Sequence, residues 1–516
     1  MVRSIAGHMA ILTALIALVE GCAVGPDFVR PAAPSVAAYT SEKAAPNLAP
    51  GGGEPSQRLV VNQAIPAAWW QLFRSPALDD VVRQAIAGSP TIEAAKVRLA
   101  QAQQAVLQAR GAYYPQIDVA ASAARQKGPP IALGIRPTHD FPATFSLYAL
   151  GPTVSFMPDV FGLTARGVEQ RQALAENQLY QLAAAQLAVT GNAVTEALTI
   201  ASVRLQIDAI EAIVADDEKT LALVQQRFEA GKAARTDVLT AETQLANDST
   251  RLPPLEQQLA AAQDALAILV GKSPAEWTPP AFALADFTLP ADLPVSLPSA
   301  LVRQRPDIMA AEAQLHASSA AIGVATAQMY PSFPLSASVG TAALATTSLF
   351  VGSSVVWTLA GGLTAPIFHG GALVAQKEGA IDAFRASLAT YRQTVLLSFG
   401  QVADTLRALG HDADLVNAAR RALNVSDAAL GLQRVSYAAG KVDSLRLIDS
   451  ERSYQQARLG YARAKAQRYL DSALLLVAMG GGWRENPAQC TDCGERPGLT
   501  GGDALPTRNP SLKGVP

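Results

Sequence analysis

The chain repeats itself, and this duplication constrains its fold more than any other feature. Pro90 and the pair Tyr114-Pro115 in the first half recur as Pro306 and Tyr330-Pro331 in the second. Both recurrences have an offset of 216 residues (306 − 90 and 330 − 114). Two long copies indicate a duplicated domain and not a solenoid of many stacked repeats. We therefore expect internal pseudo-symmetry.

A second pair of matching sequences lies further along each half. Phe228-x-x-Gly231-Lys232 recurs as Tyr437-x-x-Gly440-Lys441, with an offset of 209 residues (440 − 231). The change in offset predicts that one copy carries extra residues in its loops. The matched glycines mark places where a helix breaks or where two backbones approach closely.

Stretches rich in proline and glycine separate the two copies from each other and from the N-terminus. They predict the following organisation: a signal peptide at 1–21, a lipid-anchored linker at 22–66, a first repeat at 67–271, a Pro-rich linker at 272–298, a second repeat at 299–479 and a flexible tail at 480–516.

Each copy contains two segments in which apolar and small polar side chains alternate, as in a strand with two different faces. In the first copy the segments surround Ile117–Ala123 and Phe145–Ala149, and in the second they surround Leu335–Val339 and Val355–Leu359. After Gly151-Pro152 the apolar residues of the second segment of the first copy shift from odd to even positions, and hence to the other face of the strand. This shift suggests a bulge or a bend there.

Both copies also contain a helical segment with the spacing of a coiled coil. Apolar residues step by three and four positions from Ile207 to Phe228, interrupted only by Asp217. The matching positions in the second copy run from Val416 to Tyr437. An ordinary amphipathic helix would explain one such seam, but two matching seams favour helices packed in a coiled coil.

Four strands in one chain are too few to close a barrel in a membrane, where open sheet edges are not tolerated and about eight strands are the minimum. Three chains would supply twelve strands. Helices of about 35 to 60 residues would extend about 50–90 Å, so they belong outside the bilayer. The predicted fold class is therefore mainly α with membrane β, with four strands per chain, a twelve-stranded barrel closed by three chains, and long coiled-coil helices.

The N-terminus resembles an export signal that ends in a lipidation site. Arg3 precedes an apolar run from Met9 to Val19, and the run ends at Glu20-Gly21-Cys22. This sequence is similar to a bacterial lipobox, in which the cysteine becomes the acylated first residue. We predict lipidation of Cys22, against the alternative of an unmodified thiol.

The charge balance and the placement of reactive side chains argue against a nucleic-acid-binding protein, an enzyme and a metal-binding protein. The 41 basic and 43 acidic residues nearly balance, so no nucleic-acid-binding surface is expected. The five histidines are scattered along the sequence. A lone Cys490-x-x-Cys493 is weak support for a metal site, and a disulfide within the tail is the preferred interpretation of this pair. We expect no enzyme, no cofactor and no bound metal.

Several motifs together resemble the TolC-like outer membrane factors, and within them the lipidated OprM/NodT branch. The resemblance covers about residues 22 to 483. Its motifs are Gly21-Cys22-x-Val24-Gly25-Pro26-Asp27-Phe28, Trp69-Trp70-x-x-Phe73, Asp159-Val160-Phe161-Gly162, Pro366-Ile367-Phe368-x-Gly370-Gly371, Val402-Ala403-Asp404-x-Leu406 and Gly440-x-x-x-Ser444.

The resemblance implies an outer-membrane exit duct in a tripartite efflux system. It implies a homotrimer in the outer membrane lipid, whose twelve-stranded barrel is continued by a coiled-coil helical barrel that projects into the periplasm. There a periplasmic adaptor protein would join it to an inner-membrane pump of the RND (resistance-nodulation-division) type. Small molecules would leave through this duct. Two alternatives stay open at this point: a type I secretion channel for proteins, and a lipid-anchored periplasmic scaffold without a pore.

The resemblance also suggests a gate where the coiled-coil helices turn. By analogy the turns lie near Thr199–Leu205 and Arg407–Leu415. Around a three-fold axis, Leu409, Asp412 and Asp414 would form constricting rings, and like charges in such rings repel or attract cations. The competing interpretation is that these are solvated turn residues without a gating role.

Overall fold

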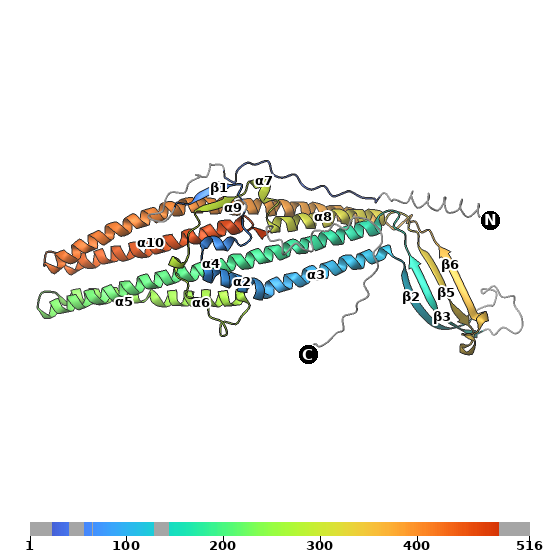
Figure 1. The fold of residues 1–516 in the computed structure, drawn as a ribbon, viewed down its shortest axis with the longest axis horizontal. Coiled ribbons are helices and arrows are strands. Elements are labelled where there is room, and N and C mark those ends of the chain that lie inside the picture. Colours follow the sequence, from blue (N-terminus) through green and yellow to red (C-terminus); the bar gives the residue numbers. More distant parts are fainter. Residues whose placement is uncertain (1–22, 41–55, 64, 128–143, 484–516) are drawn as a thin grey trace.

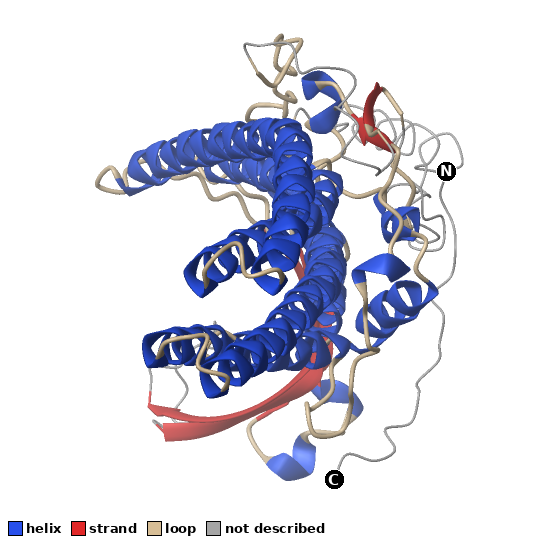
Figure 2. Cartoon of the chain, turned by 90° about the vertical axis from the view of Figure 1, so that its left-hand side faces the viewer, coloured by secondary structure: helices blue, strands red, loops and turns tan. Residues whose placement is uncertain are grey.

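The computed structural model describes residues 23–40, 56–63, 65–127 and 144–483. Four strands occupy one end of the molecule, and the long helices run from beside them, past a central region, to the opposite end (Figure 1). Seen from the helical end, the helices lie along an open arc and do not close around a core (Figure 2). Within the described residues, no helix is both long enough and apolar enough to cross a membrane.

The same order of elements occurs twice. The first series is α3 (Pro90–Arg110), β2 (Gln116–Lys127), β3 (Thr144–Phe156), α4 (Leu163–Glu229), α5 (Arg235–Ser249) and α6 (Leu252–Val270). The second series is α8 (Pro306–Ala327), β5 (Leu335–Ala343), β6 (Val355–Gly361), α9 (Ala372–Ala438) and α10 (Ser444–Ala478). From α3 to α8 the offset is 216 (306 − 90), whereas from α4 to α9 it is 209 (372 − 163). The extra residues of the first copy therefore lie between α3 and α4.

One difference between the copies has a local cause. Helix α10 is continuous, whereas its counterpart is divided between α5 and α6 after Ser249. Pro253 and Pro254 follow this division. Proline has no backbone N–H to donate and its ring clashes with the preceding turn, so the helix stops before the proline pair and a new one starts.

The four strands form one antiparallel sheet in the order β2-β3-β5-β6, which confirms the predicted strands. The two copies meet in its middle, where Val154 of β3 pairs with Ala337 of β5. The predicted bulge at Gly151-Pro152 is wrong, because the β2–β3 register passes through these residues without an inserted residue.

Helices α4 and α9 are each 67 residues long, which corresponds to about 100 Å and exceeds the predicted length. The predicted coiled-coil seam is confirmed: Ile210, Asp217 and Val224 of α4 are buried, and so are Val416, Leu430 and Tyr437 of α9. A cluster of Val224, Val238, Leu430, Tyr437 and Leu447 joins the two helical hairpins near their tips.

A central region connects the two copies. It contains β1 (Arg58–Val61) paired in parallel with β4 (Asp292–Val295), α2 (Pro76–Gly88) and α7 (Pro298–Leu301). Short 3-10 turns complete the described elements: Trp69–Phe73, Gly111–Tyr113, Leu284–Asp286, Thr346–Ser348 and Gly352–Ser354. The largest apolar core lies here, around the fully buried Trp69, Phe73 and Leu293.

Candidate functional site

The two faces of the sheet differ in polarity. Residues that pair across antiparallel strands point to the same face, so each row of partners can be followed across all four strands. One row is Ile117, Val154, Ala337 and Leu359, and the neighbouring row is Asp118, Thr153, Ser338 and Thr358. Neighbouring rows point to opposite faces. At these two rows, therefore, one face of the sheet carries apolar side chains and the opposite face carries polar ones.

The apolar face is exposed to its surroundings within one chain. Ile117 is 71% exposed, and Trp357 and Leu359 are each 76% exposed. A monomeric soluble protein rarely leaves large neighbouring apolar side chains uncovered. This face needs an apolar medium or a partner.

Both edges of the sheet are open as well. Strands β2 and β6 each pair on one side only among the described strands. An unpaired edge presents a row of N–H and C=O groups that can pair with another strand. The sheet is therefore incomplete at both ends, and the same two edges could join neighbouring copies.

The sheet passes into the helices at a junction built from both copies. Oδ2 of Asp159 accepts a 2.7 Å hydrogen bond from the backbone N–H of Ala165, which satisfies a free donor in the first turn of α4. The ring of Phe161 lies 4.9 Å from the ring of Tyr330, which follows the end of α8 in the second copy. The sequence motif Asp159–Gly162 thus marks the point where sheet and helices meet.

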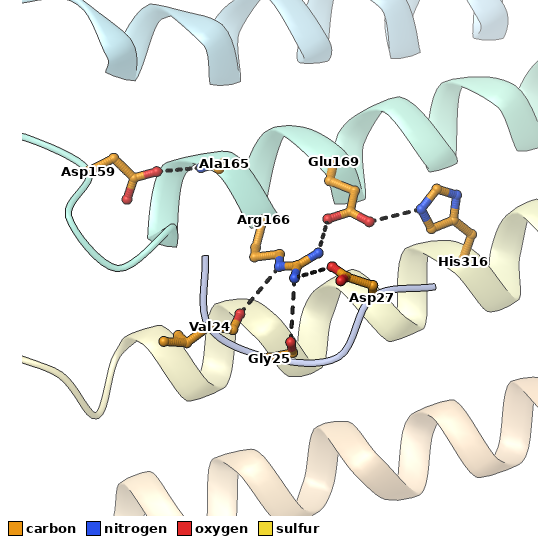
Figure 3. Close-up of polar contacts among 8 residues, drawn as sticks. All are labelled: Val24, Gly25, Asp27, Asp159, Ala165, Arg166, Glu169 and His316. Atoms are coloured by element: carbon orange, nitrogen blue, oxygen red, sulfur yellow. Dashed lines mark hydrogen bonds and ion pairs between the residues drawn. The ribbon is translucent and has the colours of Figure 1, made fainter. Parts of the chain in front are cut away.

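Arg166 forms the most connected polar cluster at this junction (Figure 3). Its side chain is 7% exposed and donates to the carbonyl oxygens of Val24 and Gly25, at 3.3 and 3.4 Å. It also pairs with the carboxylates of Asp27 and Glu169, each at 2.7 Å. These contacts hold the N-terminal segment against α4.

Sequence reasoning did not identify Arg166, although one signal was present. Arg166 lies in the first turn of α4, where the helix dipole favours acidic residues and disfavours basic ones. A cation at this place suggests a specific partner, and the structure supplies Asp27 and Glu169.

The predicted turns of the coiled coil are wrong. Helices α4 and α9 continue through Thr199–Leu205 and Arg407–Leu415. Those stretches contain no proline, and the single Gly410 costs only about 1 kcal/mol in a helix interior. The turns lie after Glu229 and after Ala438.

The matched glycines mark these turns. Gly231 and Gly440 adopt φ values of +68° and +70°, a left-handed conformation that glycine takes without strain. Each of the two helical hairpins therefore reverses at the corresponding glycine, as the predicted helix break requires.

The structure does not place the three predicted gate residues together at a tip. Leu409 is fully buried within the main core of its own chain and Asp412 is 7% exposed, so neither is free to form a ring with its copies. Asp414 is exposed in the middle of α9. The premise that these residues lie in a turn is wrong because the helix continues past them.

Asp412 instead belongs to a buried group of charges between α9 and α10. Burial and, to a lesser extent, the nearby carboxyl of Asp471 together raise the pKa of Asp412 to about 8, although the charge of Arg468 opposes the shift. Arg468 is 1% exposed and donates from Nε to Gln57. This group fixes the N-terminal linker and two helices in the central region.

The remaining chemical candidates can be placed only in part. Cys22, Cys490 and Cys493 lie outside the described residues. Among the residues that are described, no three His, Cys, Asp or Glu side chains lie together in a way that could hold a metal ion.

Comparisons with known proteins agree on one family. Residues 81–272 and 297–481 match the sequence profile of the outer membrane efflux proteins. The chain is 29% identical to the pyoverdine export outer membrane protein OpmQ of Pseudomonas aeruginosa, over 81% of this chain and 88% of that protein. It is 28% identical to the toluene efflux pump outer membrane protein TtgF of Pseudomonas putida, over 91% of this chain and 96% of that protein.

A solved structure with the same fold is the outer-membrane channel OprN. The TM-score is 0.80 at 27% sequence identity, and the match covers 90% of this chain and 100% of that chain. Both copies of the repeat and the central region therefore have counterparts in a known channel.

Proposed function

The chain belongs to the outer membrane efflux protein family and is the outer membrane channel of an efflux system, and we propose that three copies close one continuous duct through the outer membrane and into the periplasm. The observation that carries this proposal is the four-stranded sheet with one apolar face, one polar face and two open edges. In a bilayer every backbone polar group must find a partner within the protein, so such a sheet must close into a barrel.

Three chains are the simplest way to close it. Four strands from each of three chains give twelve strands, above the minimum of about eight for a bacterial barrel. The row with Leu359 would face lipid and the row with Thr358 would face the water-filled lumen. The arc of helices in each chain would then supply one third of a helical barrel, which extends about 100 Å into the periplasm.

The duct itself is passive, and its energy source lies elsewhere. We propose that an inner-membrane pump of the RND type drives transport and that a periplasmic adaptor protein joins the pump to the helical tips at Gly231 and Gly440. Relatives are named for exporting pyoverdine and toluene. These names support small organic molecules as the cargo of this chain and weigh against a channel for secreted proteins.

The proposal includes a lipid anchor on Cys22. Several acyl chains on one residue hold a protein at a membrane far more firmly than a single chain does. The anchor would keep the N-terminus at the periplasmic side of the outer membrane.

Two measurements test the channel. The purified protein should migrate as a heat-modifiable trimer, and it should conduct ions in planar lipid bilayers. Deletion of the gene should lower resistance to small toxic compounds, and the wild-type gene should restore it. A monomer that does not conduct would refute the channel, and unchanged resistance together with a protein secretion defect would favour the type I alternative.

A further inference from the structure

In each copy of the repeat one helix ends where another begins: α6 meets α3 in the first copy, and α10 meets α8 in the second. In the first copy the two backbones are in close contact, because a Cβ atom built on Gly271 would lie 2.0 Å from the carbonyl oxygen of Gly88. Gly480 is the counterpart of Gly271 at the offset of 209 (480 − 271). The atoms nearest to a Cβ built on Gly480 belong to Arg305 and Gln304 and lie 3.3 to 3.4 Å away. The second copy therefore leaves more room where its helices meet.

A groove lies at this place in the second copy. Its volume is about 530 Å³, and it is bounded by α4, α9, the start of α8 and the end of α10. Leu187, Ala188, Leu474 and Val477 belong to its apolar walls. Sites for small organic molecules have volumes of about 300–1,000 Å³ and are mainly apolar, with a few polar groups. The groove has the size and the character of such a site.

The groove opens on the side of the helices that faces away from the main core. Leu474 lines the groove and is 41% exposed, whereas the next two residues, Leu475 and Leu476, are fully buried in the main core. That core joins the helices to the central region around Trp69, and the central region lies on the convex side of the arc of helices (Figure 2). The groove therefore opens on the concave side of the arc, which would face the lumen of a closed barrel.

The positive charge in the groove is already committed within the protein. Arg305 is 8% exposed. Its Nε and Nη2 donate to the carboxylate of Asp307 at 3.0 and 2.7 Å, and Nη2 also donates to Oε1 of Gln401 at 2.9 Å. Its Nη1 donates to the carbonyl oxygen of Ala478 at 2.8 Å. Because all three guanidinium nitrogens donate within the chain and Asp307 balances the charge, this arginine offers little attraction for an anion.

The carboxylate of Asp404 is the charge that remains. Asp404 lines the groove from an exposed position of α9, and in the part of the chain that the structure describes its side chain has no hydrogen bond or ion pair. The groove is lined by this carboxylate, that of Asp307 and the guanidinium of Arg305, which together have a formal charge of −1 (1 − 2). Charges on a molecule and on its binding site are complementary when their signs are opposite. An apolar groove with an uncompensated carboxylate therefore suits a molecule that is apolar and carries a positive charge.

We propose that this groove is a binding site for amphipathic organic cations in the wall of the duct, where Leu187, Leu474 and Val477 contact the apolar part of the molecule and Asp404 pairs with its cationic group. Burial of apolar surface supplies the affinity, and the carboxylate supplies the preference for positive charge. Three chains would place three such sites around the lumen. The inference rests on the proposed duct, because only a closed barrel makes the concave side a wall that the cargo passes.

The binding test uses the purified trimer in nanodiscs of a zwitterionic lipid. The probes are tetramethylrhodamine ethyl ester, an aromatic cation, and sulforhodamine B, an aromatic anion with a similar ring system. Fluorescence polarisation reports binding, and empty nanodiscs give the background from lipid. The wild type should bind the cation saturably and the anion more weakly, whereas equal binding of the two dyes would overturn the proposal.

Asp404→Asn removes the charge and keeps the shape of the side chain. Since an ion pair at a partly exposed site contributes modestly, the Kd for the cationic dye should rise about fivefold, and the Kd for the anionic dye should not rise. Asp414→Asn is the matched control, because Asp414 is exposed on the same helix but does not line the groove. It should bind the cation as the wild type does. Wild-type affinity in Asp404→Asn, or an equal loss in Asp414→Asn, would contradict the assignment of the site.

A second pair of variants tests the apolar part of the site. Ala188→Phe places a ring in the groove and should abolish saturable binding of the cationic dye. Gln181→Phe places the same ring at an exposed position of α4 outside the groove lining and should leave binding intact. Unchanged binding in Ala188→Phe would show that the dye binds elsewhere.

Conductance in planar bilayers separates this inference from the proposed function. A trimer that conducts but shows no saturable binding of the cationic dye would refute the binding site and leave the duct intact. A protein that binds the dye but forms no channel would refute the duct, and with it the place of the groove in its wall.

Discussion

Asp217 of α4 accepts a 2.8 Å hydrogen bond from Nε2 of Gln455, which lies on α10 in the other helical hairpin. Asp217 is 3% exposed, and so is Gln455. Gln455 also contacts Gln244 of α5, which donates a 2.6 Å hydrogen bond to the fully buried Asp248. A chain of buried polar side chains therefore joins the two hairpins.

This group should make the protein less stable as the pH rises toward 8. Burial, with a smaller contribution from the carboxyl of Asp248, raises the pKa of Asp217 to about 7, although the hydrogen bond from Gln455 opposes the shift. The folded state therefore holds a proton that the unfolded chain releases near pH 4. The resulting stability is complete below pH 4 and is lost as the pH rises through about 7. The melting temperature of the purified protein in detergent should be higher at pH 5 than at pH 8.

Asp217→Asn should weaken this dependence, because an amide cannot ionise. At pH 8 the free energy of unfolding of this variant should exceed that of the wild type by on the order of 1–3 kcal/mol. The neighbouring Asp216 is the control: burial alone would raise its pKa, but hydrogen bonds from Lys219 and Arg434 lower it. Asp216→Asn should therefore lower stability equally at pH 5 and pH 8. A wild-type pH profile in Asp217→Asn would show that other groups cause the dependence.

More of the fold than of the candidate site could be predicted from the sequence. Alternation around Ile117 and Leu335 and the seam at Ile210 and Val416 are local patterns, and the structure confirms the strands and the coiled coil that they predict. The family resemblance is confirmed as well. The duplication helped because each weak pattern had a second copy.

The two failures at the candidate site have different causes. The turn near Leu409 was inferred from family analogy, whereas the position of Gly231 and Gly440 was visible in the sequence itself. Arg166 was missed because its partners Asp27 and Val24 are about 140 residues away in sequence. No periodic pattern reports a contact of that kind.

Left-handed glycines at the hairpin tips give the next prediction. No atom lies within 4 Å of a Cβ built on Gly231, so Gly231→Val should act only through the backbone and cost about 1–2 kcal/mol. Gly431→Ala is the matched comparison inside α9, where an alanine should stabilise the helix by about 0.5–1 kcal/mol. Opposite shifts in melting temperature are expected. A neutral Gly231→Val would mean that the tip readily adopts another turn.

Separate measurements of stability and of conductance can distinguish a core role of Leu409 from a gating role. Leu409 is fully buried in the main core, so Leu409→Ala should cost about 2–5 kcal/mol, as core truncations of this kind do. Asp414→Ala, at an exposed position of the same helix, should change stability little. Single-channel recordings should show the same closed state in both variants. A raised closed-state conductance in Asp414→Ala alone would support a gating role for that carboxylate.

The two faces of β6 provide the sharpest test of the membrane barrel. Leu359 and Thr358 are adjacent, but they belong to the apolar and the polar row of the sheet respectively. Arginine on a lipid-facing strand position costs about 2–4 kcal/mol at the middle of the bilayer and less near its surface. Leu359→Arg should therefore reduce the amount of heat-modifiable trimer in the outer membrane, whereas Thr358→Arg should assemble normally and shift the ion selectivity toward anions. If both variants assemble equally well, the assignment of the two faces must be abandoned, and if only Thr358→Arg fails to assemble, it must be reversed.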